Sequence, residues 1–193
     1  MIELNAYHPN RTDALDSMCD PVPAARGSFR TSGDHKGMKR ILGIVGSPRK
    51  NGNTHHMITR ILEGARKNGA KTEIIFLRNY LIKECDGCHT CWKGKPCCKS
   101  DDMIGLYSKI IASDGFVFGT PIYWFGPTAL MKGFIDRFAY FNCVQNRPEI
   151  KGKEAVVAVP FEDRTYKAAS LVVEIFEKSF HQGYKKECRV SPA

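Results

Sequence analysis

Long apolar stretches are missing from this sequence. Its longest apolar runs are about as long as a strand, far below the roughly 20 residues that a membrane-spanning helix requires. Hydrophobic residues nevertheless make up 42% of the chain, against 25% charged residues, which is not the composition of a disordered protein. We expect a globular protein without a membrane segment, and 193 residues are enough for one domain with a substantial core.

A secretory signal peptide is missing as well, because residues 1–10 contain no basic start followed by an apolar core. Eight cysteines could suggest a secreted protein, but five of them lie between Cys85 and Cys98. Cysteines this close together are poor staples for distant segments. The pattern favours metal or cluster ligation in a reducing compartment, so we expect a cytoplasmic protein.

Charge of one sign does not gather into a recognisable binding face. The net charge is +9, yet Lys and Arg are scattered in short clusters along the chain. This distribution favours a solvated basic surface over a nucleic-acid face. We therefore expect neither nucleic acid nor a membrane as a partner.

Strands and helices are expected to alternate, which predicts an α/β protein with a doubly wound parallel sheet. The expected strands lie at 39–45, 72–77, 115–119 and 155–159, and the expected helices at 54–68, 127–140 and 166–180. A further helix, capped by Ser100, Asp101 or Asp102, should run to about residue 112. Residues 183–193 are expected to supply only an incomplete fifth strand, with no final helix.

Residues 1–37 mix Pro and Gly with polar residues and show neither helical nor strand periodicity. We expect them to be a disordered leader, or to precede a natural start at Met38. Residues 38–193 would then form one domain.

The loop from Gly46 to Thr54, GSPRKNGNT, joins the first expected strand to the first expected helix. Backbone amides, hydroxyls and a helix N-terminus gathered at one point suit a phosphate. The loop is not a Walker A motif, because Asn53 stands where Lys is required, nor a G-x-G-x-x-G dinucleotide fingerprint. Turn geometry alone is the competing interpretation.

Three consecutive aromatic residues, Tyr123, Trp124 and Phe125, follow the third expected strand. Ligands of doubly wound sheets bind at the carboxyl ends of strands, so this loop and the loop at 46–54 should meet at one edge. A strand end beside Gly126 and Pro127 is a poor place to bury three large rings, which favours a stacking platform over a core position. A phosphate site beside a flat apolar surface is typical of a mononucleotide with a planar head group.

Four cysteines have the spacing C-x2-C-x2-C-x5-C, formed by Cys85, Cys88, Cys91 and Cys97. Spacing by three residues lets a loop wrap a 4Fe-4S cluster and place successive sulfurs on its corners. Zinc is an alternative, although structural zinc sites more often use two C-x2-C pairs held farther apart, and free or redox-active thiols are another. Cys98 leaves the fourth ligand ambiguous.

In these motifs and in their order, the sequence resembles the flavodoxin-like NAD(P)H-dependent FMN reductases, and specifically the iron-sulfur flavoproteins among them. The resemblance covers about residues 38–180 and rests on GSPRKNGNT, CDGCHTCWKGKPCCKSDDM and GTPIYWFGPTALMKGFIDR. It implies the strand order 2-1-3-4-5, FMN as cofactor, Cys97 as the fourth cluster ligand, and a structural pair between Asp136 and Arg137. The residues that it places around the phosphate are Ser47, Arg49, Asn51, Asn53 and Thr54. Those that it places along the ring and ribityl side are Pro121, Ile122, Tyr123, Trp124 and Phe125.

The function implied is an FMN-dependent oxidoreductase that exchanges electrons between a reduced nicotinamide, or a carrier such as ferredoxin, and an acceptor. No side chain is expected to act as general acid or base. Alternatives are a non-enzymatic electron carrier, a cluster-free NAD(P)H-dependent FMN or quinone reductase, and a zinc-stabilised nucleotide-binding regulator. The short tail would leave a sheet edge or face uncovered, which predicts a homo-oligomer, either a dimer or a tetramer.

Overall fold

A five-stranded parallel sheet forms the centre of the computed structural model, which describes residues 37–162, 166–181 and 189–190. Its strands follow the spatial order β2 (Lys71–Phe76), β1 (Arg40–Val45), β3 (Gly115–Gly119), β6 (Glu154–Ala158) and β7 (Arg189–Val190). All neighbouring strands are parallel. The predicted doubly wound α/β fold is confirmed, and the two-residue β7 lies within the tail that was expected to supply an incomplete strand.

Burial explains why β1 and β3 occupy the middle of the sheet. All five residues of β3 are buried, and so are the last four of β1. In β2, by contrast, Lys71 and Glu73 are exposed, as suits a strand at the edge. A continuous apolar run belongs where both faces of a parallel sheet are covered.

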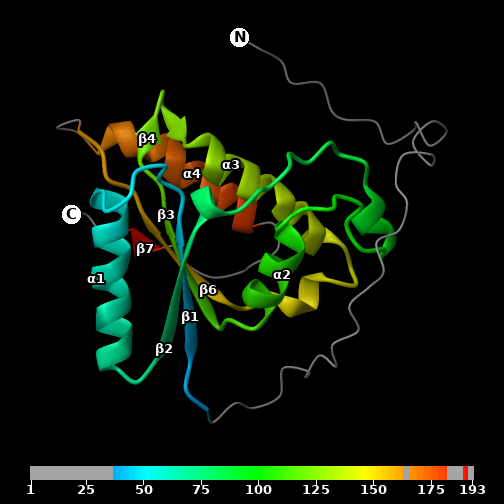
Figure 1. Ribbon diagram of the computed structural model, residues 1–193, viewed down its shortest axis with the longest axis horizontal. Helices are drawn as coiled ribbons and strands as arrows, with labels where there is room; N and C mark the ends of the chain where they lie inside the picture. The colour runs from blue at the N-terminus through cyan, green and yellow to red at the C-terminus, as the bar shows by residue number, and fades with distance from the viewer. Residues whose placement is uncertain (1–36, 163–165, 182–188, 191–193) are drawn as a thin grey trace.

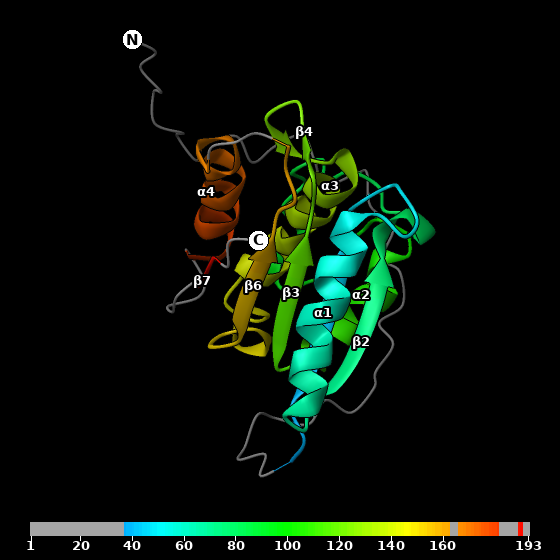
Figure 2. The ribbon, with the colours of Figure 1, turned by 90° about the vertical axis from the view of Figure 1, so that its left-hand side faces the viewer.

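Helices cover both faces of this sheet (Figure 1). The helices are α1 (Asn53–Lys67), α2 (Met103–Ile111), α3 (Ala129–Asp136) and α4 (Lys167–His181). Figure 2 shows α1 in front of the strands, α2 and α3 behind them and α4 beside β6, and residues of α2, α3 and α4 share one core. The larger core lies on the three-helix face, where Phe118 of β3 stacks on Phe180 of α4 with 4.9 Å between ring centroids. The smaller core joins Ile58 and Leu62 of α1 to the sheet.

Two glycines bring α1 into direct contact with the strands beneath it. A Cβ atom at Gly43 would lie 2.7 Å from Cγ2 of Ile58. A Cβ atom at Gly119 would lie 2.5 Å from Cδ1 of Ile58 and 2.8 Å from Cγ2 of Thr54. These distances are too short for carbon atoms in contact, so the position of α1 depends on the missing side chains.

The helix expected at 127–140 is shorter and begins later. Gly126–Pro127 form β5, which pairs antiparallel with β4 (Ile122–Tyr123). Thr128 then caps α3, because its side-chain oxygen accepts a hydrogen bond from the amide of Met131 at 3.2 Å. The expectation had placed the proline at the start of a helix, where it is common, but the short hairpin uses it instead. After Asp136 the chain tightens into the 3₁₀ helix η3 (Arg137–Asn142).

The remaining boundaries agree with the expected ones to within one residue. Three further 3₁₀ turns are η1 (Leu77–Asn79), η2 (Thr90–Lys93) and η4 (Arg147–Glu149). Among the helices of the described residues, none is long and apolar enough to cross a membrane. Residues 1–36 lie outside the described part of the chain, so the expectation of a leader there stays a prediction.

Candidate functional site

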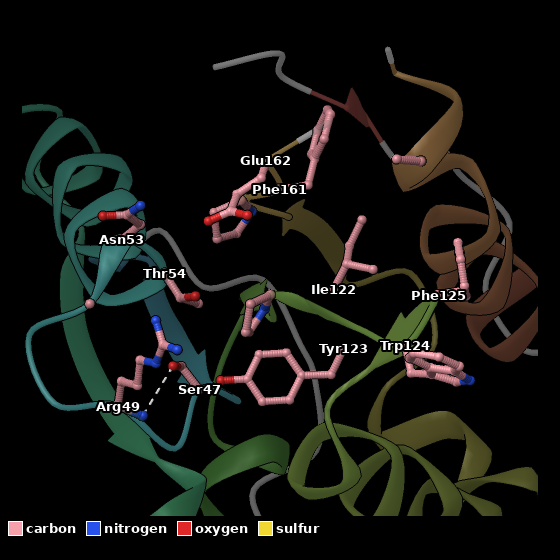
Figure 3. Close-up of a pocket in the computed structure, with 14 residues that line it drawn as sticks. Ser47, Arg49, Asn53, Thr54, Ile122, Tyr123, Trp124, Phe125, Phe161 and Glu162 are labelled. Carbon is pink, nitrogen blue, oxygen red and sulfur yellow. Dashed lines mark hydrogen bonds between the residues drawn. The ribbon is translucent and has the colours of Figure 1, made fainter. Parts of the chain in front are cut away.

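The carboxyl ends of β1 and β3 open onto one cavity of about 620 Å³, which we call the sheet-edge pocket. Its walls come from the loops after β1, β3 and β6 and from the start of α1 (Figure 3). It is lined by Ser47, Arg49, Gly52, Asn53, Thr54, Pro121, Ile122, Tyr123, Trp124, Phe125, Pro160, Phe161, Glu162 and Ala168.

Nine of the ten residues that were expected to surround FMN line this pocket. The exception is Asn51, which has a φ of 51° in the turn before α1 and is not part of the lining. The lining also includes Pro160, Phe161 and Glu162 from the loop after β6. Sequence reasoning missed these three, because their loop lacks the Gly-rich character that would mark a flavin contact.

Ser47 and Thr54 form a buried polar end of the pocket, with 3% and 2% of their surfaces exposed. The Ser47 hydroxyl accepts a hydrogen bond from the amide of Arg49 at 3.2 Å, the dashed line in Figure 3. α1 begins directly after Gly52, with no side chain of the described residues capping it and no acidic residue in its first turn. The positive end of the helix dipole and its main-chain amides are therefore placed to attract an anion.

Two buried threonines fix the loops after β1 and β3 relative to each other. The amide of Gly46 donates to the carbonyl of Gly119 at 2.7 Å, and the hydroxyl of Thr128 donates to the carbonyl of Gly46 at 2.5 Å. The amide of Thr128 in turn donates to the hydroxyl of Thr120 at 3.1 Å. Sequence reasoning missed both residues, and the one signal that could have found Thr128 is its position just ahead of a helix.

The three consecutive aromatic residues are exposed, so they do not belong to the core. Tyr123 is 43% exposed, Trp124 94% and Phe125 70%. The ring of Tyr123 points toward Ser47 and Arg49, whereas the rings of Trp124 and Phe125 lie on the far side of the hairpin (Figure 3). Trp124 and Phe125 have φ values of 47° and 64°, a left-handed conformation that large side chains rarely adopt. The expected platform is therefore divided between two sides of the β4–β5 turn.

The cysteine segment surrounds a second cavity of about 90 Å³, which we call the cysteine cavity. It is lined by Cys85, Asp86, Gly87, Cys88, His89, Thr90, Cys91, Trp92, Cys97, Lys99, Arg137 and Ala139, a set that includes all four predicted cluster ligands. Burial, and then the negative charges that Cys97, Cys85 and Cys88 carry as thiolates, raise the pKa of Cys91 to about 11. The four cysteines thus share one cavity.

Side chains that line the same cavity are not necessarily arranged to ligate the same ion. Within the described residues, no group of three or more His, Cys, Asp or Glu side chains is arranged to hold a metal ion. The structure therefore brings the four thiols to one place, but it does not arrange them as a preformed metal site. The donor set is of the type that an iron-sulfur cluster or zinc accepts.

A buried ion pair anchors the cysteine segment to the helical layer. The side chains of Arg137 and Asp101, which pair with each other, are 1% and 0% exposed. Arg137 also donates to the carbonyl of Lys83 at 2.8 Å and to the sulfur of Cys97 at 3.3 Å. Burial opposes the charge of Arg137, but the hydrogen bond to Asp101 raises its pKa, so the guanidinium stays charged.

The expected pair between Asp136 and Arg137 is wrong. Asp136 is partly exposed and pairs with Lys132, one helical turn earlier, at 2.5 Å. Arg137 is directed inward to Asp101 instead. Asp101 also accepts hydrogen bonds from the amides of Lys83 at 2.8 Å and Met103 at 3.1 Å. One carboxylate thus joins the cysteine segment, the start of α2 and the end of α3.

Comparisons with known proteins agree with the motifs. A family model described as NADPH-dependent FMN reductase matches residues 39–174. The chain is 36% identical over 114 residues to an iron-sulfur flavoprotein of Archaeoglobus fulgidus, a match that covers 59% of this chain and 50% of that protein. A second iron-sulfur flavoprotein of the same organism is 42% identical over 98 residues, or 51% of this chain and 48% of that protein. The chain spans about half the length of these curated relatives.

Solved structures share the fold at low identity. The crystal structure of RosB with bound 8-demethyl-8-formylriboflavin-5'-phosphate has a TM-score of 0.61 and 16% identity, and the match covers 81% of this chain and 62% of that one. A likeness at this identity shows the architecture alone.

Proposed function

Because the chain belongs to the NADPH-dependent FMN reductase family, we propose that it is an oxidoreductase that binds FMN in the sheet-edge pocket. Its electrons would pass between NAD(P)H, or a ferredoxin-type carrier, and an acceptor. One observation carries this proposal: the loops after β1 and β3, recognised separately in the sequence, line a single cavity at the carboxyl edge of the sheet.

The chemistry of the pocket suits the two ends of FMN. Ser47, Thr54 and the amides at the start of α1 offer donors for a phosphate, and Arg49 adds a positive charge. Tyr123 and Ile122 offer apolar area to a flat ring. Thr128 holds the two loops at a fixed separation, so these groups are positioned before any ligand arrives.

We further propose that Cys85, Cys88, Cys91 and Cys97 hold a 4Fe-4S cluster. The support is their spacing, their shared cavity, and the name iron-sulfur flavoprotein carried by the relatives in Archaeoglobus fulgidus. The segment between η1 and α2 has few regular elements, so few main-chain hydrogen bonds of helices or strands would have to break for its thiols to close around a cluster. Arg137 would then donate a charged hydrogen bond to a ligand sulfur.

When both groups are bound, FMN supplies two-electron hydride chemistry and the cluster supplies one-electron transfer. The residues of this chain bind and orient these groups. Tyr123 and the β4–β5 hairpin cover one side of the pocket, and Phe161 belongs to its lining from the loop after β6. No side chain is assigned a role as general acid or base.

Anaerobic purification with counts of flavin, iron, sulfide and zinc tests both proposals. We expect about one FMN per chain, about four iron and four sulfide atoms, and a broad absorbance near about 400 nm. Flavin without iron would indicate a cluster-free reductase, and zinc without iron would contradict the cluster. Steady NAD(P)H oxidation by the holoprotein would support an enzyme, whereas only slow turnover would indicate an electron carrier.

The assignment of the phosphate end is tested by two arginines of the same region. Arg49→Gln removes a charge from the pocket and should weaken FMN binding about 10-fold or more, the loss expected for one charged hydrogen bond. Arg60→Gln is the matched control, because Arg60 lies on the exposed face of α1 and pairs only with Glu63 among the described residues. Quenching of flavin fluorescence measures both, and equal effects would contradict the assignment.

We also propose that the chain forms a dimer or a tetramer. The support is the exposure of Trp124 and Phe125, two large apolar rings side by side in the β4–β5 turn. Size-exclusion chromatography of the pure holoprotein should show an oligomer, and a monomer would contradict this. The cytoplasmic location stays a prediction.

A further inference from the structure

A fifth cysteine lies beside the four proposed ligands. The sulfur of Cys98 is 3.5 Å from the sulfur of Cys88, although the two are ten positions apart in the chain. The neighbouring Cys97 has a different partner, because its sulfur accepts a hydrogen bond from Arg137 at 3.3 Å. The adjacent Cys97 and Cys98 therefore make different contacts, and the four proposed cluster ligands are complete without Cys98.

A shared carboxylate holds the two chain segments together around this pair. Asp86 accepts a hydrogen bond from the amide of Cys88 at 3.2 Å and forms an ion pair with Lys99 at 2.5 Å. Asp86 precedes Cys88 by two residues, and Lys99 directly follows Cys98. The ion pair therefore keeps the backbone of one cysteine near that of the other.

We propose that Cys88 and Cys98 form a disulfide in the cluster-free protein, with a low-molecular-weight disulfide such as oxidised glutathione as the oxidant. The sulfurs, now 3.5 Å apart, must approach to a bond length of about 2.05 Å. Both cysteines are half-buried and lie outside helices and strands, so a small movement of the loop is enough. The segment is thus a modification site as well as a proposed ligand set.

The exchange balances in two steps. The sulfur of one cysteine attacks the small disulfide, forming a mixed disulfide and releasing one small thiol. The sulfur of the other cysteine then attacks the protein-bound sulfur, forming the Cys88–Cys98 bond and releasing the second small thiol. Two electrons pass from the cysteine pair to the small disulfide, and the two cysteine protons end on the two released thiols.

The disulfide would block cluster loading, because a disulfide sulfur cannot ligate iron as a thiolate. This consequence rests on the proposed function, in which Cys88 is a ligand. A thiol reductant would restore the four-thiol set. The loaded cluster would in turn protect Cys88, since its sulfur would be bound to iron.

Peptide mapping of the full-length, cluster-free chain tests the pairing. The protein is incubated with oxidised glutathione, alkylated and digested with trypsin, which cuts after Lys93 and so separates Cys88 from Cys98. We expect a linked peptide pair and the loss of two alkylatable thiols. Because one peptide holds Cys85, Cys88 and Cys91 and the other holds Cys97 and Cys98, the decisive comparison is between variants on both sides of the link. Cys97→Ser and Cys85→Ser should retain the linked peptide, whereas Cys98→Ser and Cys88→Ser should each reduce it at least about 10-fold.

Equal yields from Cys97→Ser and Cys98→Ser would overturn the assignment, as would a linked peptide lost only in Cys97→Ser. Cluster reconstitution, followed by iron counts, tests the consequence separately. Oxidised wild-type protein should load iron only after reduction, whereas oxidised Cys98→Ser should load it at once. Equal iron loading of the two oxidised proteins would contradict the claim that the disulfide blocks cluster loading. A disulfide in a protein that never loads iron would contradict the proposed cluster and leave the pairing in place.

Discussion

In the sheet-edge pocket, polar groups are positioned by main-chain bonds between strand ends, as between Gly46 and Gly119, to which the Thr128 hydroxyl adds one neutral hydrogen bond. In the cysteine cavity, the loop is held by side chains that reach across long stretches of sequence, above all Arg137 and Asp101. The first region is held in place because it continues the sheet, and the second is anchored chiefly by one buried ion pair. A single substitution should therefore disturb the cysteine cavity far more than the pocket.

The largest effect is expected from Arg137→Met. It leaves Asp101 buried without its cation, which should cost about 3–5 kcal/mol of unfolding free energy. Lys132→Met is the matched control, since it breaks the partly exposed pair with Asp136 and should cost no more than about 0.5 kcal/mol. Denaturant unfolding of the two variants measures the difference. Similar losses in both would show that the cysteine segment is not fastened by this pair.

A smaller effect is expected from Thr128→Val in the sheet-edge pocket. The variant leaves the carbonyl of Gly46 and the amide of Met131 without their partner, a loss of about 1–3 kcal/mol. FMN binding should weaken about 2- to 10-fold, because the two loops are no longer joined. Thr59→Val is the control, since the buried Thr59 hydroxyl has no hydrogen-bond partner among the described residues. Thr59→Val should be neutral or stabilising. A loss of stability and FMN affinity equal to that of Thr128→Val would contradict the role of Thr128 in joining the two loops.

Trp92 lines the cysteine cavity and Trp124 lines the sheet-edge pocket, so substituting each of them tests whether the two regions act independently. Trp92 stacks on His89 at 4.4 Å and donates to the carbonyl of Ala139 at 3.0 Å, so Trp92→Ala should cost about 1–2 kcal/mol and leave FMN binding unchanged. Trp124 is 94% exposed, so Trp124→Ala should change stability by less than about 0.5 kcal/mol. It should, however, weaken FMN binding about 2- to 10-fold. Denaturant unfolding and flavin titration measure both variants. If each variant changed both the free energy of unfolding and the affinity for FMN, the independence of the two regions would be contradicted.

The last effect concerns the far end of α2, whose start is joined to the cysteine segment. Lys153 donates to the carbonyls of Ile111 at 2.6 Å and Ile110 at 3.2 Å, and burial lowers its pKa to about 8. An unfolded lysine has a pKa of about 10.4. Between these values the unfolded chain holds a proton that the folded chain has released, so the contribution of Lys153 to stability rises with pH.

The measurement compares wild-type protein with Lys153→Met by urea unfolding at about pH 7.5 and 9.5, on either side of most of this titration. The stability of the wild type relative to the variant should increase with pH. Lys151→Met, a change at an exposed neighbour, should show no such trend. A difference that does not vary with pH for Lys153→Met would contradict the lowered pKa.

Sequence reasoning reached the sheet and the pocket for physical reasons. The run GFVFG of β3 is apolar throughout because both faces of a central parallel strand are covered. The meeting of the loops after β1 and β3 follows from a general rule of doubly wound sheets. Local signals of this kind lie within a few residues of the element that they describe.

The side-chain network had no local signal. Arg137 and Asp101 are 36 residues apart in the chain. The sequence instead favours a pair between Arg137 and Asp136, because the two are adjacent. Thr128 is linked to Gly46 across 82 residues. Contacts of this range leave no periodic pattern, so only the folded chain shows them.

Because Gly43 and Gly119 have no side chains, α1 lies close to the sheet, and a larger residue at either position would crowd the contact between them. One added methyl group at Gly119 would press on Ile58 and Thr54, so either these side chains or α1 itself would have to shift. Since Asn53 and Thr54 lie in the wall of the cavity, its width would change although Gly119 itself is not part of the lining. A substitution beneath the helix is thus a way to change the cavity while every residue that lines it stays the same.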